Sequence, residues 1–398
     1  MDKGESSKKN FLFKIYFFIA VISLALIGVL IGFIFTELEK NYPLYFKNHL
    51  WTTILLVIIT LISTIIIHEL SHLAMFLKVG FKIRLFALGP VLLIKELSGW
   101  SLKFKFNPSI GIGGMVLPNI IELKTQGQFN RVRNDYAKGM LVAPVVSAIQ
   151  GILSFLCIFI LSKTVKEEFQ STAFTIFISS FFTCLYINIT SLINIGGVVG
   201  DYKAYKLFRK DDGFAAYQLY SYAMLSTEKQ NARENCDRAK EIMEITLEEN
   251  FRRGVLDSLS CLMIDTFLYE YLSNDTPMPI VIEKYIYYYL DNIKKYQSFL
   301  IIESYYILLI HILLYISDKD IENSRLVWES IKSKIPKNKV GRYYTNQIET
   351  KLYYDEKKEC LLRNEKIVIS SIDSIMNIFE NYYEDELKIL NRRIKPLA

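Results

Sequence analysis

The chain has 398 residues, of which 51% are hydrophobic and 22% charged, and its formal net charge is +6. This length allows two or three domains, and the apolar residues are concentrated in the first half. The five cysteines are scattered without close pairs, which argues against a zinc knuckle and against a disulfide framework. Much of the basic excess lies in one loop between apolar segments, so it suits attachment to a membrane surface and requires no nucleic-acid partner.

Four segments have the length and apolarity to span a bilayer, namely residues 15–35, 50–77, 140–161 and 173–195. The first follows a basic start, as a signal peptide would. It is longer than the usual apolar core of a signal peptide, however, and no small-x-small cleavage site follows Phe35. We therefore expect a retained membrane anchor and a membrane-embedded, helical N-terminal half.

The distribution of lysine and arginine predicts the orientation of these segments. The loop between the second and third segments is rich in both residues, whereas the turn after the first has only Lys40 and Lys47. The basic loop should therefore be cytoplasmic, together with the N-terminus and everything after residue 195. The expected protein is a multi-pass protein of the cell membrane.

The second segment contains the sequence His68-Glu69-Leu70-Ser71-His72, an HExxH motif at its predicted cytoplasmic end. Helical residues four apart lie on one face, so the two histidines can hold one Zn²⁺ while Glu69 serves as general base towards the attacking water. Polar residues at a helix end can also be merely solvated. An ionisable cluster in a membrane segment is nevertheless costly and marks function, so the motif predicts a catalytic zinc site.

Zinc needs one more protein ligand, and Asp201 is the first acidic residue after the fourth segment. Topology places it on the same side of the membrane as the histidines, after a glycine-rich turn able to bend it inward. A carboxylate there can also be the hydrated start of a cytosolic segment. Glu122 and Asp135 of the basic loop are the alternative ligands, but neither follows a span expected beside the histidines.

Residues from about 52 to 202 resemble the site-2 protease family of intramembrane zinc metalloproteases. Besides the HExxH motif, the similar stretches are Phe86-Ala87-Leu88-Gly89-Pro90, Gly113-Gly114-Met115-Val116, Ala143-Pro144-Val145-Val146-Ser147 and the stretch from Asn188 to Asp201. The last departs from the family pattern, because Ser191 replaces a proline and Tyr202 a glycine. The longer gap between Asn188 and Asp201 resembles the pattern of a divergent, peptide-processing branch of the family.

The resemblance implies a site in which His68, His72 and Asp201 bind Zn²⁺ and Glu69 is catalytic. Asn188 and Asn194 are then candidate donors to the oxyanion of the transition state, with Asn188 favoured by the motif match. Gly113 and Gly114 are candidate substrate contacts.

The basic loop contains three stretches with the alternating pattern of short strands, residues 82–86, 101–106 and 110–117. We expect them to form a small sheet beside the metal. An open edge of that sheet could bind an unwound substrate through backbone hydrogen bonds, or the strands could serve only in packing.

Helical periodicity dominates from residue 211 onward, in segments 214–225, 228–249, 255–272, 282–290 and 299–316. Breaks are expected near Thr276-Pro277 and Ile335-Pro336. Such helices could pack as a short α-solenoid, although the residue signature of tetratricopeptide repeats is absent. His311 lies in an apolar run and is expected to be a core histidine.

The predicted fold is a membrane all-α core of about four transmembrane helices with a small β-rich cytoplasmic loop, followed by a cytosolic all-α domain. The expected parts are residues 1–49 (tail and first anchor), 50–204 (metalloprotease core) and 205–398 (helical domain). We expect a zinc endopeptidase that cuts membrane segments, signal-peptide remnants or small secreted peptide precursors, with a possible protein partner on the helical domain. The rival interpretations are a metal-free membrane scaffold and an accessory subunit of peptide export or immunity.

Overall fold

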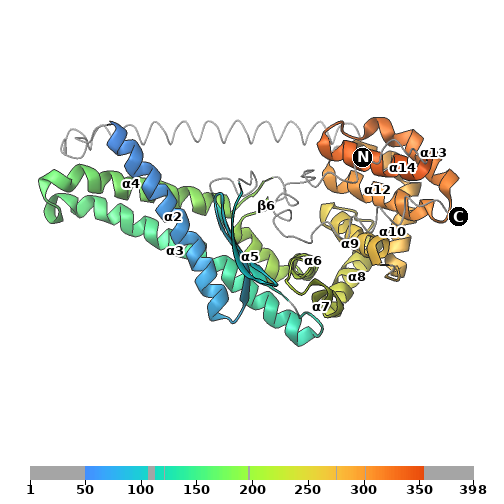
Figure 1. Cartoon of the computed structure of the whole chain (residues 1–398), viewed down its shortest axis with the longest axis horizontal. Coiled ribbons are helices and arrows are strands. Elements are labelled where there is room, and N and C mark those ends of the chain that lie inside the picture. The colour runs from blue at the N-terminus through green and yellow to red at the C-terminus, as the bar shows by residue number, and fades with distance from the viewer. Residues whose placement is uncertain are drawn as a thin grey trace. The chain divides into compact units, whose positions relative to one another are not determined.

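The computed structural model describes residues 50–105, 113–120, 122–195, 198–274, 276–300 and 302–353. These contain 13 α-helices, a four-stranded antiparallel sheet and a two-stranded ribbon (Figure 1). The predicted mainly helical fold with a small sheet is therefore confirmed at this level. The first predicted span, residues 15–35, lies outside the described residues.

Three described helices are long and apolar enough to cross a membrane: α2 (Leu50–Lys78), α3 (Gln126–Thr164), within which the stretch 126–161 qualifies, and α4 (Glu167–Ser191). They correspond to the second, third and fourth predicted spans. Much of their side-chain surface is apolar and exposed, as at Ile59, Ile152 and Phe159. A surface of this kind suits lipid rather than water, so the three helices support membrane association by length and composition.

Two of these helices begin or end at features that the sequence encodes. Helix α2 ends where Gly80 adopts φ of +90°, and the Phe81 N–H then donates to the Phe76 carbonyl, as in a Schellman cap. Helix α3 begins with a capping box, because the Thr125 hydroxyl accepts from the Gln128 N–H while the Gln128 amide oxygen accepts from the Thr125 N–H. The capping box explains why α3 begins well before the predicted apolar run.

The sheet has the strand order β3-β2-β1-β4. Its strands are β1 (Lys82–Leu88), β2 (Val91–Glu96), β3 (Gly99–Phe104) and β4 (Gly114–Asn119). A two-residue turn, Gly89-Pro90, joins β1 to β2, and Gly89 takes φ of +52° there. Pro118 lies in β4, which is an edge strand of this sheet, where a missing N–H is tolerated.

Three of the four strands were predicted at least in part. The prediction for 110–117 is met from Gly114 onward, and residues 106–112 lie outside the described residues. Strand β2 was not predicted, because Val91-Leu92-Leu93-Ile94 is a continuous apolar run without alternation. Strand β2 pairs with both β1 and β3 and is therefore an inner strand of the sheet.

The described chain after residue 200 is helical throughout. Its larger helices are α5 (Asp201–Lys210), α6 (Asp212–Ala223), α8 (Asp237–Arg252), α9 (Ser258–Asn274), α10 (Ile280–Asp291), α12 (Glu303–Ser317), α13 (Ile321–Ile331) and α14 (Lys339–Tyr353). Two shorter ones are α7 (Lys229–Glu234) and α11 (Ile293–Tyr296). Helix α8 packs on α6, α9 and α10, and α12 packs on α9, α13 and α14. The predicted solenoid arrangement remains a prediction.

One predicted helix, 228–249, is in fact two. Helix α7 ends and α8 begins around Asn235 and Cys236, where the Leu123 N–H donates to the Asn235 carbonyl and the Arg238 N–H donates to the Leu123 carbonyl. These backbone bonds to a distant segment replace the bonds that a continuous helix would make. The predicted breaks near Thr276-Pro277 and Ile335-Pro336 are confirmed.

The chain divides into two compact units, whose boundary falls inside α2. In the first, α3 and α4 pack through Ile158, Leu161 and Phe174. In the second, the sheet packs through a core that includes Leu85, Leu92, Ile94 and Leu117, together with Leu225 from the segment after α6. His311 is 5% exposed and hydrogen-bonds Asp265, as expected of a core histidine with a satisfied ring.

Candidate metal centre

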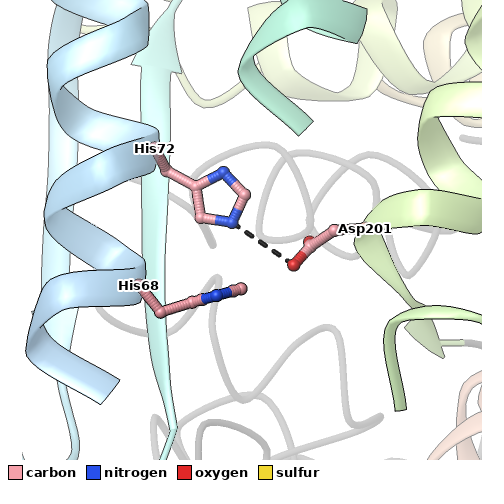
Figure 2. Close-up of side chains that lie close together, drawn as sticks. All are labelled: His68, His72 and Asp201. Atoms are coloured by element: carbon pink, nitrogen blue, oxygen red, sulfur yellow. Dashed lines mark hydrogen bonds and ion pairs between the residues drawn. The ribbon is translucent and has the colours of Figure 1, made fainter. Parts of the chain in front are cut away.

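His68 and His72 lie one above the other on α2, one helical turn apart, and both rings point towards Asp201 (Figure 2). One potential ligand atom from each of the three residues lies within 4.8 Å of the other two. Both histidines are buried, with 6% and 4% of their surface exposed, and the Asp201 side chain is 28% exposed. Among the described residues, this is the group of histidine and carboxylate side chains that could hold a metal ion.

His72 and Asp201 have the separation that a shared metal requires. His72 Nε2 and Asp201 Oδ2 are 3.3 Å apart. Two atoms bound to one tetrahedral Zn²⁺ at about 2.0–2.1 Å would themselves be about 3.3 Å apart. The His68 ligand atom lies within 4.8 Å of the other two, so His68 can serve as the third ligand.

The tautomer of His72 also favours a cation at this point. His72 Nδ1 lies 2.8 Å from the Gly139 carbonyl oxygen, which can only accept, so Nδ1 carries a proton. In the neutral ring, Nε2 then presents a lone pair towards a carboxylate oxygen. Two acceptors facing each other need a proton or a metal ion between them. The donor set therefore fits a divalent ion bound through Nε2.

His68 is fixed in a similar way by a different partner. Its Nδ1 lies 2.9 Å from the hydroxyl of Ser147, a residue of α3 that is fully buried. A metal ion would therefore be bound through Nε2 of this ring. Sequence reasoning assigned no role to Ser147 or to Gly139, and the structure places both as partners that orient the histidine rings.

Gly139 is required for a second reason. A Cβ atom there would come within 2.2 Å of the Phe76 ring, so the absence of a side chain lets α3 approach α2 closely. Pro144, five residues further along α3, has no N–H to offer the Met140 carbonyl and so loosens this part of the helix. The close approach at Gly139 brings its carbonyl to His72.

A tight turn delivers Asp201 to the site. After α4, the strands β5 (Asn194–Ile195) and β6 (Val198–Val199) form a short hairpin, and the Gly200 N–H donates to the Ile193 carbonyl at 3.0 Å. A Cβ on Gly200 would lie 2.5 Å from the Thr190 carbonyl oxygen, so glycine is needed. Asp201 then begins α5. Of the glycines in the expected turn, Gly200 is described and lies in the place predicted for it, whereas residues 196–197 lie outside the described residues.

Glu69 is buried at 6% exposure and lies directly against strand β4. A Cβ on Gly114 would come within 2.3 Å of the Glu69 Cγ and 2.6 Å of its carboxyl carbon. Gly114 therefore gives the Glu69 side chain the space it occupies. Gly113 precedes it and accepts a hydrogen bond from the Gly89 N–H.

The other predicted site residues are placed differently. The Asn188 amide donates to the Cys184 carbonyl, one turn earlier in its own helix. Asn194 pairs with Val199 through the backbone, and its side chain lies outside what the structure describes. Their role towards an oxyanion remains a prediction. The alternative ligands Glu122 and Asp135 are not in the metal group; Glu122 accepts from Gln128, and Asp135 pairs with Lys138.

Two tyrosines lie near Asp201. The ring centroids of Tyr222 in α6 and Tyr136 in α3 are 5.3 Å apart. Loss of hydration raises the pKa of Tyr222, and the Asp201 carboxylate raises it further while the hydrogen bond with Tyr136 lowers it. The Tyr222 phenol therefore stays protonated and keeps its capacity to donate.

No protein-family model matches the sequence, and neither a curated protein nor a solved structure matches it.

Proposed function

We propose that the protein is an integral-membrane zinc endopeptidase of the site-2 protease type. The observation that carries this proposal is the presence of Asp201 beside the two histidines of an HExxH helix. Two histidines and one carboxylate are the protein ligands of many catalytic zinc sites, which keep a fourth position open. That α2 is also long and apolar enough to span a membrane supports proteolysis at or within the bilayer.

In this proposal His68, His72 and Asp201 would hold the ion. Zn²⁺ supplies a Lewis acid that makes water nucleophilic near neutral pH. Glu69 follows His68 directly on α2 and removes the proton from the attacking water, then returns it to the amide nitrogen that leaves. Ser147 and Gly139 orient the two rings throughout.

The substrate would bind as an extended strand. Helical peptide bonds are occupied by their own hydrogen bonds, so a membrane segment must unwind before it is cut. Strand β4 is an edge of the four-stranded sheet, and its first residue, Gly114, lies against Glu69. A chain added to this edge would run past the general base. Membrane segments, signal-peptide remnants and small secreted peptide precursors are the substrate classes that fit.

The Glu69→Gln variant tests this function. It keeps the metal ligands and removes the base, so purified protein should bind zinc as the wild type does while losing cleavage of membrane peptides, by about 10²-fold or more. Peptides that accumulate in membranes carrying Glu69→Gln would identify natural substrates by mass spectrometry. Undiminished cleavage in this variant would refute the protease proposal, and a wild type without bound metal would favour the scaffold interpretation.

A further inference from the structure

A cavity of 330 Å³ lies among the three membrane-length helices. Its lining is divided by chemistry: four side chains are apolar, and six are polar. The polar residues are Thr60 and Thr64 with Ser63 on α2, Gln150 and Ser154 on α3, and Ser180 on α4. Polar groups are costly at membrane depth and usually mark function.

The hydrogen bonds inside the cavity leave one group unsatisfied. The Gln150 amide nitrogen lies 3.4 Å from the Thr64 hydroxyl and 3.2 Å from the Ser180 hydroxyl, and the Ser154 hydroxyl donates to Ser180. The Gln150 amide oxygen is buried and has no hydrogen-bond partner among the described residues. An unsatisfied acceptor at membrane depth costs free energy, and lipid tails cannot relieve that cost. The cavity therefore fits an occupant that brings a hydrogen-bond donor.

The cavity is aligned with the metal ligands. Thr60, Thr64, His68 and His72 recur at four-residue spacing, so they lie along one face of α2, and each is less than 9% exposed. At 1.5 Å per residue, Thr64 and Thr60 are about 6 and 12 Å along the helix from His68. An occupant of the cavity would therefore be a short distance from the proposed cleavage point.

We propose that this cavity selects substrates by receiving a polar, donor-bearing side chain from the membrane segment of the substrate, with Gln150 as the residue that accepts the hydrogen bond. If the substrate is helical between the two points, the selected residue would lie about four to eight positions from the cleaved bond. Asparagine, glutamine, serine or threonine supplies the donor. The inference rests on the proposed function for its substrate, but the binding step is independent of cleavage.

Binding can be measured in nanodiscs with the full-length Glu69→Gln protein, so that no peptide is consumed. The probes are two fluorescent leucine-rich peptides of about 20 apolar residues. One carries a single central asparagine, and the other carries leucine at that position. The asparagine peptide should bind about three- to tenfold more tightly, the range expected of one interhelical hydrogen bond in a membrane.

Two further variants locate the effect. Gln150→Met should abolish the preference for asparagine, whereas Thr183→Val, whose hydroxyl donates only to its own helix backbone at Ser179, should keep it. Unchanged zinc content in Gln150→Met would show that the fold of this variant is intact. If Gln150→Met fails to fold, Ser180→Ala is tested in its place. Equal binding of the two peptides would overturn the inference.

A photo-crosslinking amino acid at Ile59, which lines the cavity, identifies the occupant. Cross-links to the asparagine peptide support the proposal. Cross-links to residues 15–35 of the same chain would overturn it, because that segment would then fill the cavity. If the wild type cut no peptide but bound the asparagine peptide more tightly in a Gln150-dependent way, only the protease proposal would be refuted. If the wild type cut peptides with zinc but showed no preference for the asparagine peptide, only the cavity proposal would be refuted.

Discussion

The space around Gly114 allows a direct test of how Glu69 is held. In Gly114→Ala the new methyl carbon would lie 2.3 Å from the Glu69 Cγ, 2.6 Å from its carboxyl carbon and 2.8 Å from the Ala87 carbonyl oxygen. Non-bonded carbon atoms normally stay about 3.5–4.0 Å apart. The Glu69 side chain or strand β4 must therefore move by about 1 Å or more, and rotation of Glu69 alone would not relieve the contact with Ala87.

Such a displacement should act on catalysis more than on metal binding. A shift of about 1 Å in a catalytic group can lower the rate about 10²-fold, and overpacking of this kind costs about 1–3 kcal/mol of stability. The assay is cleavage of a membrane peptide substrate together with zinc content of the purified protein. Gly114→Ala should lose about 10²-fold in cleavage rate while keeping its zinc.

Gly127→Ala is the matched control, because a Cβ there would meet only the Thr125 hydroxyl, at 4.0 Å. That variant should cleave like the wild type. If Gly114→Ala also cleaved at the wild-type rate, the placement of Glu69 against β4, and with it the role of this strand, would be refuted.

Two further predictions concern the groups that support the site. Ser147→Ala removes the partner of His68 Nδ1 and should weaken zinc binding about tenfold or more in a competition titration; an unchanged affinity would mean that this hydrogen bond does not orient the ring. Arg84→Met removes a buried cation that donates to the Leu225 carbonyl and pairs with Glu96, so it should lower the free energy of unfolding by about 3 kcal/mol. Lys103 is a second, more exposed partner of Glu96, so Lys103→Met should lower it by about 1 kcal/mol or less. Equal losses in the two variants would contradict this difference in burial.

The local parts of the site could be predicted from the sequence. The HExxH spacing fixes the relation of His68, Glu69 and His72 within one helix, and long apolar runs predict the helices of membrane-spanning length. Asp201 is 129 residues from His72, and its place beside the histidines was predicted on the expectation that successive spans return the chain to the same side of a membrane.

Other features depend on contacts between distant segments, which leave weak local signals. Ser147 and Gly139 contact the histidine rings because α3 packs on α2. A serine or a glycine in a sequence does not by itself indicate that it orients a histidine. The break between α7 and α8 has no proline or glycine and arises from backbone bonds between Leu123 and the segment around Asn235. Strand β2 lacks alternation in its sequence because its exposed face is apolar as well: Leu92 and Ile94 are buried, whereas Val91 and Leu93 are exposed.

The central claim is that Asp201 completes a metal site with the two histidines. Zinc content of purified Asp201→Ala, measured by mass spectrometry beside the wild type, Glu122→Ala and Asp135→Ala, tests it most directly. The wild type and the two control variants should carry zinc, since Glu122 and Asp135 lie outside the metal group, while Asp201→Ala should lose most of its zinc and all cleavage. Normal zinc content in Asp201→Ala would contradict the assignment.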